Sequence, residues 1–370
     1  MLTLKKVGVR SKIVARNIVY KLPYRPRAFI IRTYHKTKDS PKVVKYFFND
    51  IAKAGLLGDT VLLEHCSMCQ LKCPVCPTAS GANKTAAVGW GYLKFENFKK
   101  LVDGSPEIKN IEMSNWGEIF LNPELKDIIK YAHDKGIKLT AGNGVNLNNA
   151  SKEVLDHVVK YQVRHLNCSI DGATNEVYQM YRKGGDLNKV LENIRYINEL
   201  KEKYNTPYPK LSWQFIIFGH NEHEIVQAKK MAEELNMTFK PKLNATHWEG
   251  VFSPVKDKEK ASKESGLGVS SRDDFKEKYK RAYLLPCKQF WMSPQINWDG
   301  KLLGCCDNRW GDFGNVFEQG LDATLKGEKF VYAKQMLLGQ KPARADIPCI
   351  KCPIYKEIKE KPMTTMDIIS

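Results

Sequence analysis

From residue 58 onward, short apolar segments alternate with longer segments in which apolar residues recur at helical spacing. The apolar segments that read as strands are 59–66, 108–116, 137–143, 163–171, 210–218 and 238–245. The intervening segments carry helix boundaries: Asn122 and Pro123 suit a helix start and Gly136 its end, and a further helix opens at Asn221. Alternating strands and helices are typical of a parallel sheet. The pattern predicts an α/β fold of six βα units, which fits an open, partial (β/α)6 barrel of the TIM type.

Changes in composition suggest how the chain is divided. We expect a basic segment at 1–57, the barrel at 58–250, a charged linker with a short helix at 251–286, a small cysteine-containing domain at 287–355 and a tail at 356–370. A chain of 370 residues is long enough for one large domain and a smaller one. Apolar runs fall short of the roughly 18 residues of a membrane span, and no secretory signal is recognisable. We therefore expect a cytoplasmic protein with reduced thiols.

Positive charge is concentrated at the start of the chain. The net charge is +18, and residues 1–57 contribute 14 Lys and Arg against Asp39 and Asp50, or +12. Apolar residues are interleaved with these bases at roughly helical spacing, as in a segment that lies on an anionic membrane surface. The alternative, which we favour, is a solvated arm packed on the outside of the barrel. Nucleic acid is the less favoured partner.

Four cysteines lie in the run CSMCQLKCPVC, directly after the first predicted strand. Cys69, Cys73 and Cys76 have C-x3-C-x2-C spacing, with which three thiolates can ligate three irons of a cubane and leave the fourth iron open. Zinc knuckles are normally a dozen or more residues apart, and ferredoxins space their ligands differently. The run resembles that of the radical S-adenosylmethionine (SAM) enzymes, in which SAM chelates the open iron and is cleaved to a 5′-deoxyadenosyl radical. Cys66 is then surplus, and we expect it to be buried.

The same resemblance suggests SAM contacts at the ends of later strands. Gly117 and Glu118 correspond to the family's GGE motif, whose acceptors receive the SAM ammonium group, although Trp116 replaces the first glycine. Ser169 and Asp171 alternate onto one face of a strand and could bind the ribose hydroxyls. Arg182 stands where the family often places an arginine against the SAM carboxylate.

A second group of cysteines lies near the C-terminus. The pattern WDGKLLGCCD followed by C-x2-C resembles the SPASM extension in its shortened form, the twitch domain, which binds an auxiliary [4Fe–4S] cluster. The residues available for that cluster are Cys287, Cys305, Cys349 and Cys352. Two well-separated ligand pairs also suit zinc, so this alternative stays open.

Two further cysteines remain. Cys306 could donate a hydrogen atom to a substrate radical, or it could only pack. Cys168 alternates away from Ser169 and is expected in the core.

The resemblance implies an enzyme that removes a hydrogen atom from an unactivated C–H bond. An auxiliary cluster that accepts an electron suits oxidation, and no peptide-binding domain is recognisable, so we expect a small polar substrate similar to a sugar or cyclitol. Epimerisation and peptide modification are the alternatives within the family, and a basic zinc protein that binds nucleic acid is the alternative outside it. The basic surface would suit an acidic flavodoxin or ferredoxin as electron donor.

Overall fold

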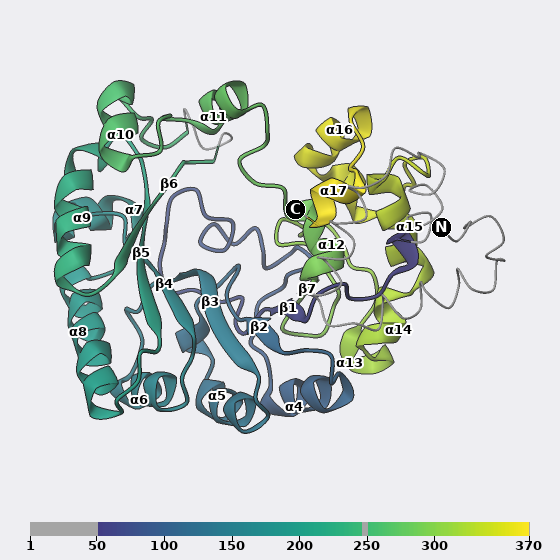
Figure 1. Cartoon of the computed structure of the whole chain (residues 1–370), viewed down its shortest axis with the longest axis horizontal. Coiled ribbons are helices and arrows are strands. Elements are labelled where there is room, and N and C mark those ends of the chain that lie inside the picture. The colour runs from purple at the N-terminus through teal and green to yellow at the C-terminus, as the bar shows by residue number, and fades with distance from the viewer. Residues whose placement is uncertain (1–50, 246–250, 370) are drawn as a thin grey trace, which may run out of the picture.

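A parallel sheet of seven strands is the framework of the chain (Figure 1). The computed structural model describes residues 51–245 and 251–369, so the membrane contact considered for segment 1–57 falls almost wholly outside the described residues. The strands are β1 (Thr60–Leu63), β2 (Asn110–Glu112), β3 (Lys138–Val145), β4 (His165–Ser169), β5 (Lys210–Ile216), β6 (Thr238–Lys242) and β7 (Gln295–Ile296). Their order is β6-β5-β4-β3-β2-β1-β7, and every pairing is parallel. The six predicted strands and the open α/β architecture are confirmed.

Helices cover one face of this sheet as a continuous outer layer (Figure 1). They are α4 (Phe95–Gly104), α5 (Leu125–Asp134), α6 (Lys152–Lys160), α7 (Asn175–Tyr181), α8 (Leu187–Lys203) and α9 (Ile225–Glu234), with 3-10 turns η2 (Ile51–Lys53), η3 (Ile119–Leu121) and η4 (Glu222–Glu224). Alternate strand residues such as Val61, Leu63 and Ile111 are buried under these helices in the core. The opposite residues of each strand face the concave side, where the candidate site lies. None of the helices in the described parts of the chain is long and apolar enough to cross a bilayer.

The predicted helix start, with Asn122 as N-cap and Pro123 as first helical residue, is two residues too early. Helix α5 begins at Leu125, and its N-cap is Glu124. Asn122 is buried and used differently: its Nδ2 donates to the carbonyls of His65 and Leu93, at 3.1 and 3.0 Å, and its Oδ1 accepts from Glu124 N. The Asn122 side chain thus connects the segments of His65 and Leu93 to the start of this helix, and Glu124 is the N-cap residue.

Residues 251–286 hold two helices rather than one short helix. They are α10 (Lys258–Ser265) and α11 (Arg272–Tyr279), whose N-caps are Asp257 and Ser271. Ala261 of α10 is fully buried, and α10 packs beside α9.

The C-terminal part contributes a strand to the barrel sheet. Its elements are η6 (Pro286–Lys288), α12 (Gln289–Met292), β7, α13 (Val316–Gln319), α14 (Leu321–Leu325), α15 (Glu328–Leu337), η7 (Pro348–Lys351), α16 (Pro353–Glu360) and α17 (Thr365–Ile369). Strand β7 pairs with β1, matching Gln295 to Leu62 and Ile296 to Leu63. After β7 the chain turns at Gly300, which has a φ of 89°, and Leu302 forms an antiparallel bridge back to Ile296. This turn directly precedes Cys305.

A buried lysine ties the C-terminal part to the start of the described chain. Lys334 on α15 is fully buried, its ammonium donates to Ala54 O at 2.7 Å and it lies 4.6 Å from the ring centre of Phe330. Burial lowers the pKa of Lys334 to about 7.

Between pH 7 and about 10.5, Lys334 should be protonated in the unfolded chain and neutral in the folded chain. The free energy of unfolding should therefore rise with pH across this range. We expect Lys334→Met to flatten the rise, measured by anaerobic urea unfolding at pH 7 and pH 9.5. Lys326→Met, at an exposed ion pair with Asp322, is the control. An unchanged pH slope in Lys334→Met would contradict the expectation.

Candidate functional site

The first cysteine group lies in the loop that follows β1, at the carboxyl end of the sheet. Cys66 ends the strand segment: it is fully buried and forms a β-bridge with Tyr92. Cys73 is buried, whereas Cys69 and Cys76 are partly exposed. The amide of Cys76 donates to Cys73 O at 3.2 Å, which folds the loop into a turn. The three thiols beyond Cys66 are thus carried by one short, turned loop.

Two hydrogen-bond donors approach the sulfurs of this loop. Asn146 Nδ2 lies 3.8 Å from Cys69 Sγ, and Arg182 Nη1 lies 3.9 Å from Cys73 Sγ. Burial, together with the neighbouring Glu118, raises the pKa of Cys69 to about 12, and burial also raises the pKa of Cys73 above its usual value. Free thiols here would be protonated, and a bound metal cluster together with these donors would favour the thiolate form.

Gly117 brings the loop after β2 into close contact with the cysteine loop. A Cβ atom at this position would overlap the carbonyl oxygens of Cys66 and Met68, so only glycine permits the approach. The next amide, Glu118 N, donates to Met68 O at 2.8 Å.

The Glu118 carboxylate is buried and bound to backbone amides. One oxygen accepts from Phe120 N at 3.2 Å and the other from Asn146 N at 2.6 Å. Burial raises the pKa of Glu118 to about 7. Each oxygen retains a second lone pair with which it could accept an ammonium group.

Asp171 and Arg182 form a buried ion pair beside the cysteine loop. Asp171 is fully buried, and its two oxygens accept from Arg182 Nε and from Ile216 N, both at 2.6 Å. The pair directs the guanidinium toward Cys73 and stacks it 4.9 Å from the ring centre of Tyr181. In this arrangement, Asp171 positions Arg182.

Ser169 shares the concave face with Asp171, as alternation predicts. Its hydroxyl lies 3.5 Å from Gln214 Nε2, and Gln214 in turn accepts from Asn167. Cys168 points the other way, into the core.

Two buried carboxylates near these loops were not predicted as site residues. Glu64, at the end of β1, accepts from Trp116 N at 2.9 Å, and burial raises its pKa to about 8. Glu64 Oε1 and Trp116 Nε1 are buried with no hydrogen-bond partner in the described chain. Glu224 accepts from Ala173 N at 2.5 Å and from Thr174 Oγ1, so it fixes the loop after β4. Glu64 could have been proposed from the sequence, because an acidic residue that directly follows an apolar strand, as in VLLEHC, lies at the end of the sheet where sites form.

The second group of cysteines converges from distant segments. Cys287 lies in η6, Cys305 after the β7 turn, Cys349 in η7 and Cys352 at the start of α16, and all four are buried. Burial, together with charge on Cys349 and Cys352, raises the pKa of Cys287. The pKa of Cys305 is raised by burial and by Cys287 and its other neighbours.

Cys306 lies at the edge of this group. Its amide donates to Gln289 Oε1 at 2.7 Å, and its carbonyl accepts from Asn115 of the loop after β2. Burial and the neighbouring Asp307 raise the pKa of Cys306 to about 12, and Lys242 on β6 is among its charged neighbours. Cys306 therefore lies between the auxiliary cysteines and the concave face of the sheet.

Both groups have the donor set of an iron–sulfur centre. Within residues 51–245 and 251–369, no three Cys, His, Asp or Glu side chains are grouped as ligands of a single metal ion. A cubane binds each thiolate through a different iron, so its ligands lie farther apart than those of one ion. The glycine contact at Gly117, the orphaned buried atoms of Glu64 and Trp116 and the donors to Cys69 and Cys73 fit a polar cofactor beside the first group.

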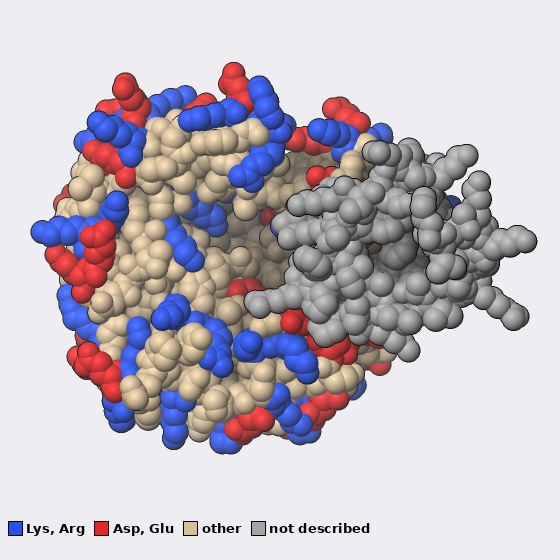
Figure 2. Space-filling model, viewed as in Figure 1, with Lys and Arg blue, Asp and Glu red and all other residues tan. Residues whose placement is uncertain are grey.

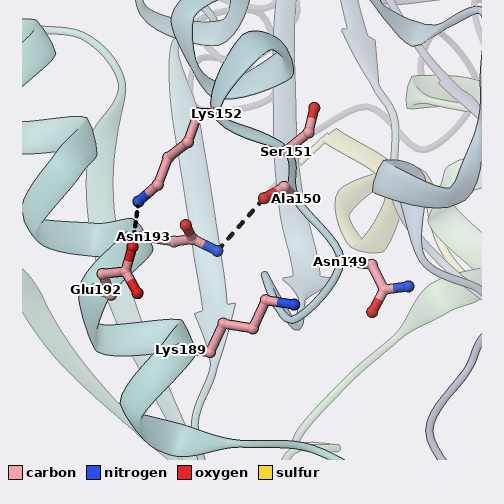
Figure 3. Close-up of a pocket in the computed structure, with 7 residues that line it drawn as sticks. All are labelled: Asn149, Ala150, Ser151, Lys152, Lys189, Glu192 and Asn193. Carbon is pink, nitrogen blue, oxygen red and sulfur yellow. Dashed lines mark hydrogen bonds and ion pairs between the residues drawn. The ribbon is translucent and has the colours of Figure 1, made fainter.

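A surface pocket of about 400 Å³ lies outside this arrangement (Figure 3). It is lined by Asn149, Ala150, Ser151, Lys152, Lys189, Glu192 and Asn193, at the start of α6 and along α8. Lys152 pairs with Glu192 at 2.7 Å across it, and Asn193 donates to Ala150 O. The pocket contains no cysteine and none of the predicted site residues.

Replacing Glu118 and Arg182 should separate binding from folding. We expect Glu118→Gln to weaken SAM binding about ten- to a hundredfold, because a charge-assisted contact contributes about 1.5–3 kcal/mol. We expect Arg182→Ala to destabilise the fold as well, by about 3–5 kcal/mol, because it leaves Asp171 buried and uncompensated. Calorimetric titration with SAM and urea unfolding measure the two effects. Unchanged SAM affinity in Glu118→Gln would contradict the first, and unchanged stability in Arg182→Ala the second.

Comparisons with known proteins give family matches for two regions of the chain. The model of the radical SAM superfamily matches residues 63–232, and that of the SPASM iron–sulfur cluster-binding domain matches residues 287–353. No curated protein matches. Among solved structures, Streptococcus suis SuiB is 12% identical with a TM-score of 0.56, over 82% of this chain and 74% of SuiB. The structure of anSMEcpe with bound AdoMet is 14% identical with a TM-score of 0.52, over 81% of this chain and 88% of that one. At these identities the two structures support the fold alone.

The matched regions coincide with the two cysteine groups. The first begins in β1 and includes Cys69, Cys73 and Cys76, and the second begins at Cys287 and extends past Cys352. A radical SAM domain uses a [4Fe–4S] cluster and SAM, and a SPASM domain carries auxiliary iron–sulfur chemistry. On the evidence of its open parallel sheet, its cysteine loop and both family matches, the chain belongs to the radical SAM superfamily and carries a C-terminal SPASM domain.

Proposed function

We propose that this radical SAM enzyme removes a hydrogen atom from a small polar substrate similar to a sugar or cyclitol, and that the overall reaction is an oxidation. The supporting observation is the polar lining of the concave face of the sheet. The residues that form this lining are Glu112, Ser114, Thr140, His165, Asn167, Ser169, Ser212 and Gln214. Hydroxyl, amide and carboxylate groups of this kind suit the hydroxyls of a polyol better than an apolar substrate.

The proposed roles of the chain's own residues follow from their positions. Cys69, Cys73 and Cys76 would hold the SAM-binding cluster, and Cys287, Cys305, Cys349 and Cys352 the auxiliary cluster. When bound, the first cluster together with SAM would supply a 5′-deoxyadenosyl radical, and the auxiliary cluster would serve as an electron carrier. Asn146 and Arg182 orient the first group by donating to two of its sulfurs. Gly117, Glu118, Ser169 and Arg182 remain the proposed SAM contacts. Both oxygens of Asp171 are bound to Arg182 and Ile216 N, so we assign it to holding Arg182 in place rather than to the ribose hydroxyls.

Epimerisation is the runner-up for a small substrate. Its requirement is a hydrogen-atom donor near the substrate, and Cys306 is the candidate because it lies beside the concave face. A thiol with a pKa of about 12 is protonated at neutral pH and keeps the hydrogen that this step needs.

Peptide modification is the second candidate. SuiB has been solved bound to its precursor peptide SuiA, and anSMEcpe with AdoMet and the Cp18Cys peptide. This candidate rests on shared fold, whereas the polar lining is a property of this chain. For either candidate, an acidic flavodoxin or ferredoxin would suit the net charge of +18 as the electron donor.

Anaerobic incubation with SAM and dithionite tests the reaction, with 5′-deoxyadenosine measured by chromatography. Aminocyclitols and sugars deuterated on their ring carbons identify the substrate class, because abstraction transfers deuterium into 5′-deoxyadenosine. Deuterium transfer from a peptide but from none of these polyols would favour the second candidate. Failure to form 5′-deoxyadenosine at all would overturn the proposal.

A further inference from the structure

Two lysines of the edge strand β6 face the concave side of the sheet. Lys240 and Lys242 are two residues apart and therefore point to the same face. Lys240 is exposed, and its ammonium lies 3.4 Å from His165 Nε2 on β4. Lys242 is partly buried, and its ammonium lies 3.4 Å from Gln214 Oε1 on β5. Both cations thus reach over the polar lining of the neighbouring strands.

Lys242 lies between the two cysteine groups. Its charged neighbours are Arg272, Asp171, Cys306 and Arg182. Arg182 contacts Cys73 of the first group, and Cys306 adjoins the second. A molecule held by Lys242 would therefore lie between the two proposed clusters.

Among the described residues, no carboxylate forms an ion pair with the Lys242 ammonium. Burial and the adjacent Arg272 lower the pKa of Lys242, which shows that its positive charge is poorly compensated. In the described ranges 51–245 and 251–369 no carboxylate lies within ion-pair distance of its ammonium. Asp171, the nearest acidic influence, is bound to Arg182 and Ile216 N. Among the residues that the structure describes, the Lys242 ammonium has one long contact, to the amide oxygen of Gln214. A partly buried cation in such surroundings is costly unless an anion binds to it.

Arg272 adds a second cation from another segment. It is the first residue of α11, its Nη2 donates to Leu243 O at 3.4 Å, and its guanidinium lies 5.1 Å from the ring centre of Tyr283. These contacts hold it beside the end of β6. Lys242 of β6 and Arg272 of α11 are therefore neighbouring cations from separate elements, an arrangement that suits the binding of a phosphate or a carboxylate.

The acidic groups of the region face other partners. Glu112 on β2 accepts from Thr140 Oγ1 and from Gly142 N. Asp307 lies beside Cys287 and Cys306, on the side of the auxiliary cysteines. Figure 2 shows a hollow in this face of the molecule, with Lys and Arg side chains and some Asp and Glu side chains along its described edge.

We propose that Lys242 and Arg272, with Lys240 two residues earlier on β6, bind an anionic oxygen group of the substrate, either a phosphate or a carboxylate. The inference rests on the proposed function, because it takes the concave face to be the substrate site. It narrows the substrate class to polar molecules that carry such a group, for example a sugar phosphate or a sugar acid. The anion would anchor one end of the substrate and leave its C–H bonds between the two cysteine groups.

Calorimetric titration of the reconstituted, SAM-loaded enzyme tests the site. SAM is bound beforehand so that its own carboxylate does not compete. Inorganic pyrophosphate and citrate are the probes at low ionic strength, and the tighter probe indicates whether phosphate or carboxylate is preferred. We expect Lys242→Gln to weaken the tighter probe at least about tenfold, because a charge-assisted contact is lost, and Lys242→Arg to retain most of the affinity. Lys229→Gln, at an exposed position on α9, is the matched control and should bind as the wild type does.

Equal affinity in Lys242→Gln and Lys229→Gln, or no binding of either probe by the wild type, would overturn the inference. Lys242 would then act only as an inward-pointing charge that protects a sheet edge from pairing. If Lys242→Gln loses iron or unfolds, the exposed Lys240→Gln decides in its place: a smaller loss of affinity is expected, and none would overturn the proposal. The proposed function fails separately, through absence of 5′-deoxyadenosine in the wild type, and the titration does not depend on that result.

Discussion

Replacing any one of Cys69, Cys73 and Cys76 by alanine should abolish formation of 5′-deoxyadenosine. With one thiolate missing, the loop would hold a three-iron cluster or none, and the open iron that chelates SAM would be lost. We expect activity to fall to the background of protein-free assays. Iron content and 5′-deoxyadenosine are measured on the same anaerobic preparations.

Cys66→Ala is the matched control, because it removes a thiol from the same run of sequence. Cys66 is buried at a β-bridge, and its thiol faces Met68 O at 3.7 Å. We expect a modest loss of stability and nearly normal iron content. Wild-type rates in Cys69→Ala would refute the assignment of the first group.

The double replacement of Cys349 and Cys352 by alanine should remove one cluster and leave the other. We expect about eight irons per reconstituted wild-type chain and about four in the double variant, as for two and one [4Fe–4S] clusters. For an oxidation, the variant should still cleave SAM but should not release the oxidised product, because the substrate radical has lost its electron acceptor. Iron content, 5′-deoxyadenosine and product are measured together.

Cys306→Ala distinguishes the reaction types. In an oxidase it should retain both iron and turnover, whereas in an epimerase it should retain iron and lose turnover. A wild-type content of four irons with bound zinc would contradict the presence of two clusters.

The barrel could be predicted from sequence because its strands and helices differ in period. Strands such as 210–218 are apolar and bounded by turn residues, and the alternating order implies parallel pairing. The pairing of β7 with β1 could not be predicted, since Gln295 and Ile296 are too short a segment to show which strand they join. The helix boundary at Asn122 was misplaced because an asparagine suited to capping is used instead to bind the carbonyls of His65 and Leu93.

The candidate ligands Cys69, Cys73 and Cys76 could be proposed from sequence because spacing within a loop is local information. The side chains that contact these cysteines could not be predicted, because they come from other strands, as Asn146 does when it approaches Cys69 from the end of β3. The same holds for contacts across the concave face, such as that between Lys242 on β6 and Gln214 on β5. Glu224 is the N-cap residue of α9, yet its carboxylate makes no capping hydrogen bond and binds the loop after β4 instead. Such contacts depend on how the strands are arranged in the open sheet, which no single segment encodes.

The pairing of β7 with β1 affects when iron can be loaded relative to synthesis of the chain. β1 carries the SAM-cluster loop, but its outer edge is completed only when residues near 295 have been synthesised. Until then, Leu62 and Glu64 lack the backbone partners Pro294 and Ile296, and a nascent chain exposes an unpaired parallel edge beside the cysteine loop. Iron delivery to Cys69, Cys73 and Cys76 is therefore expected to follow release of nearly the whole chain from the ribosome, so truncation before β7 should reduce iron loading at a site far upstream in the sequence.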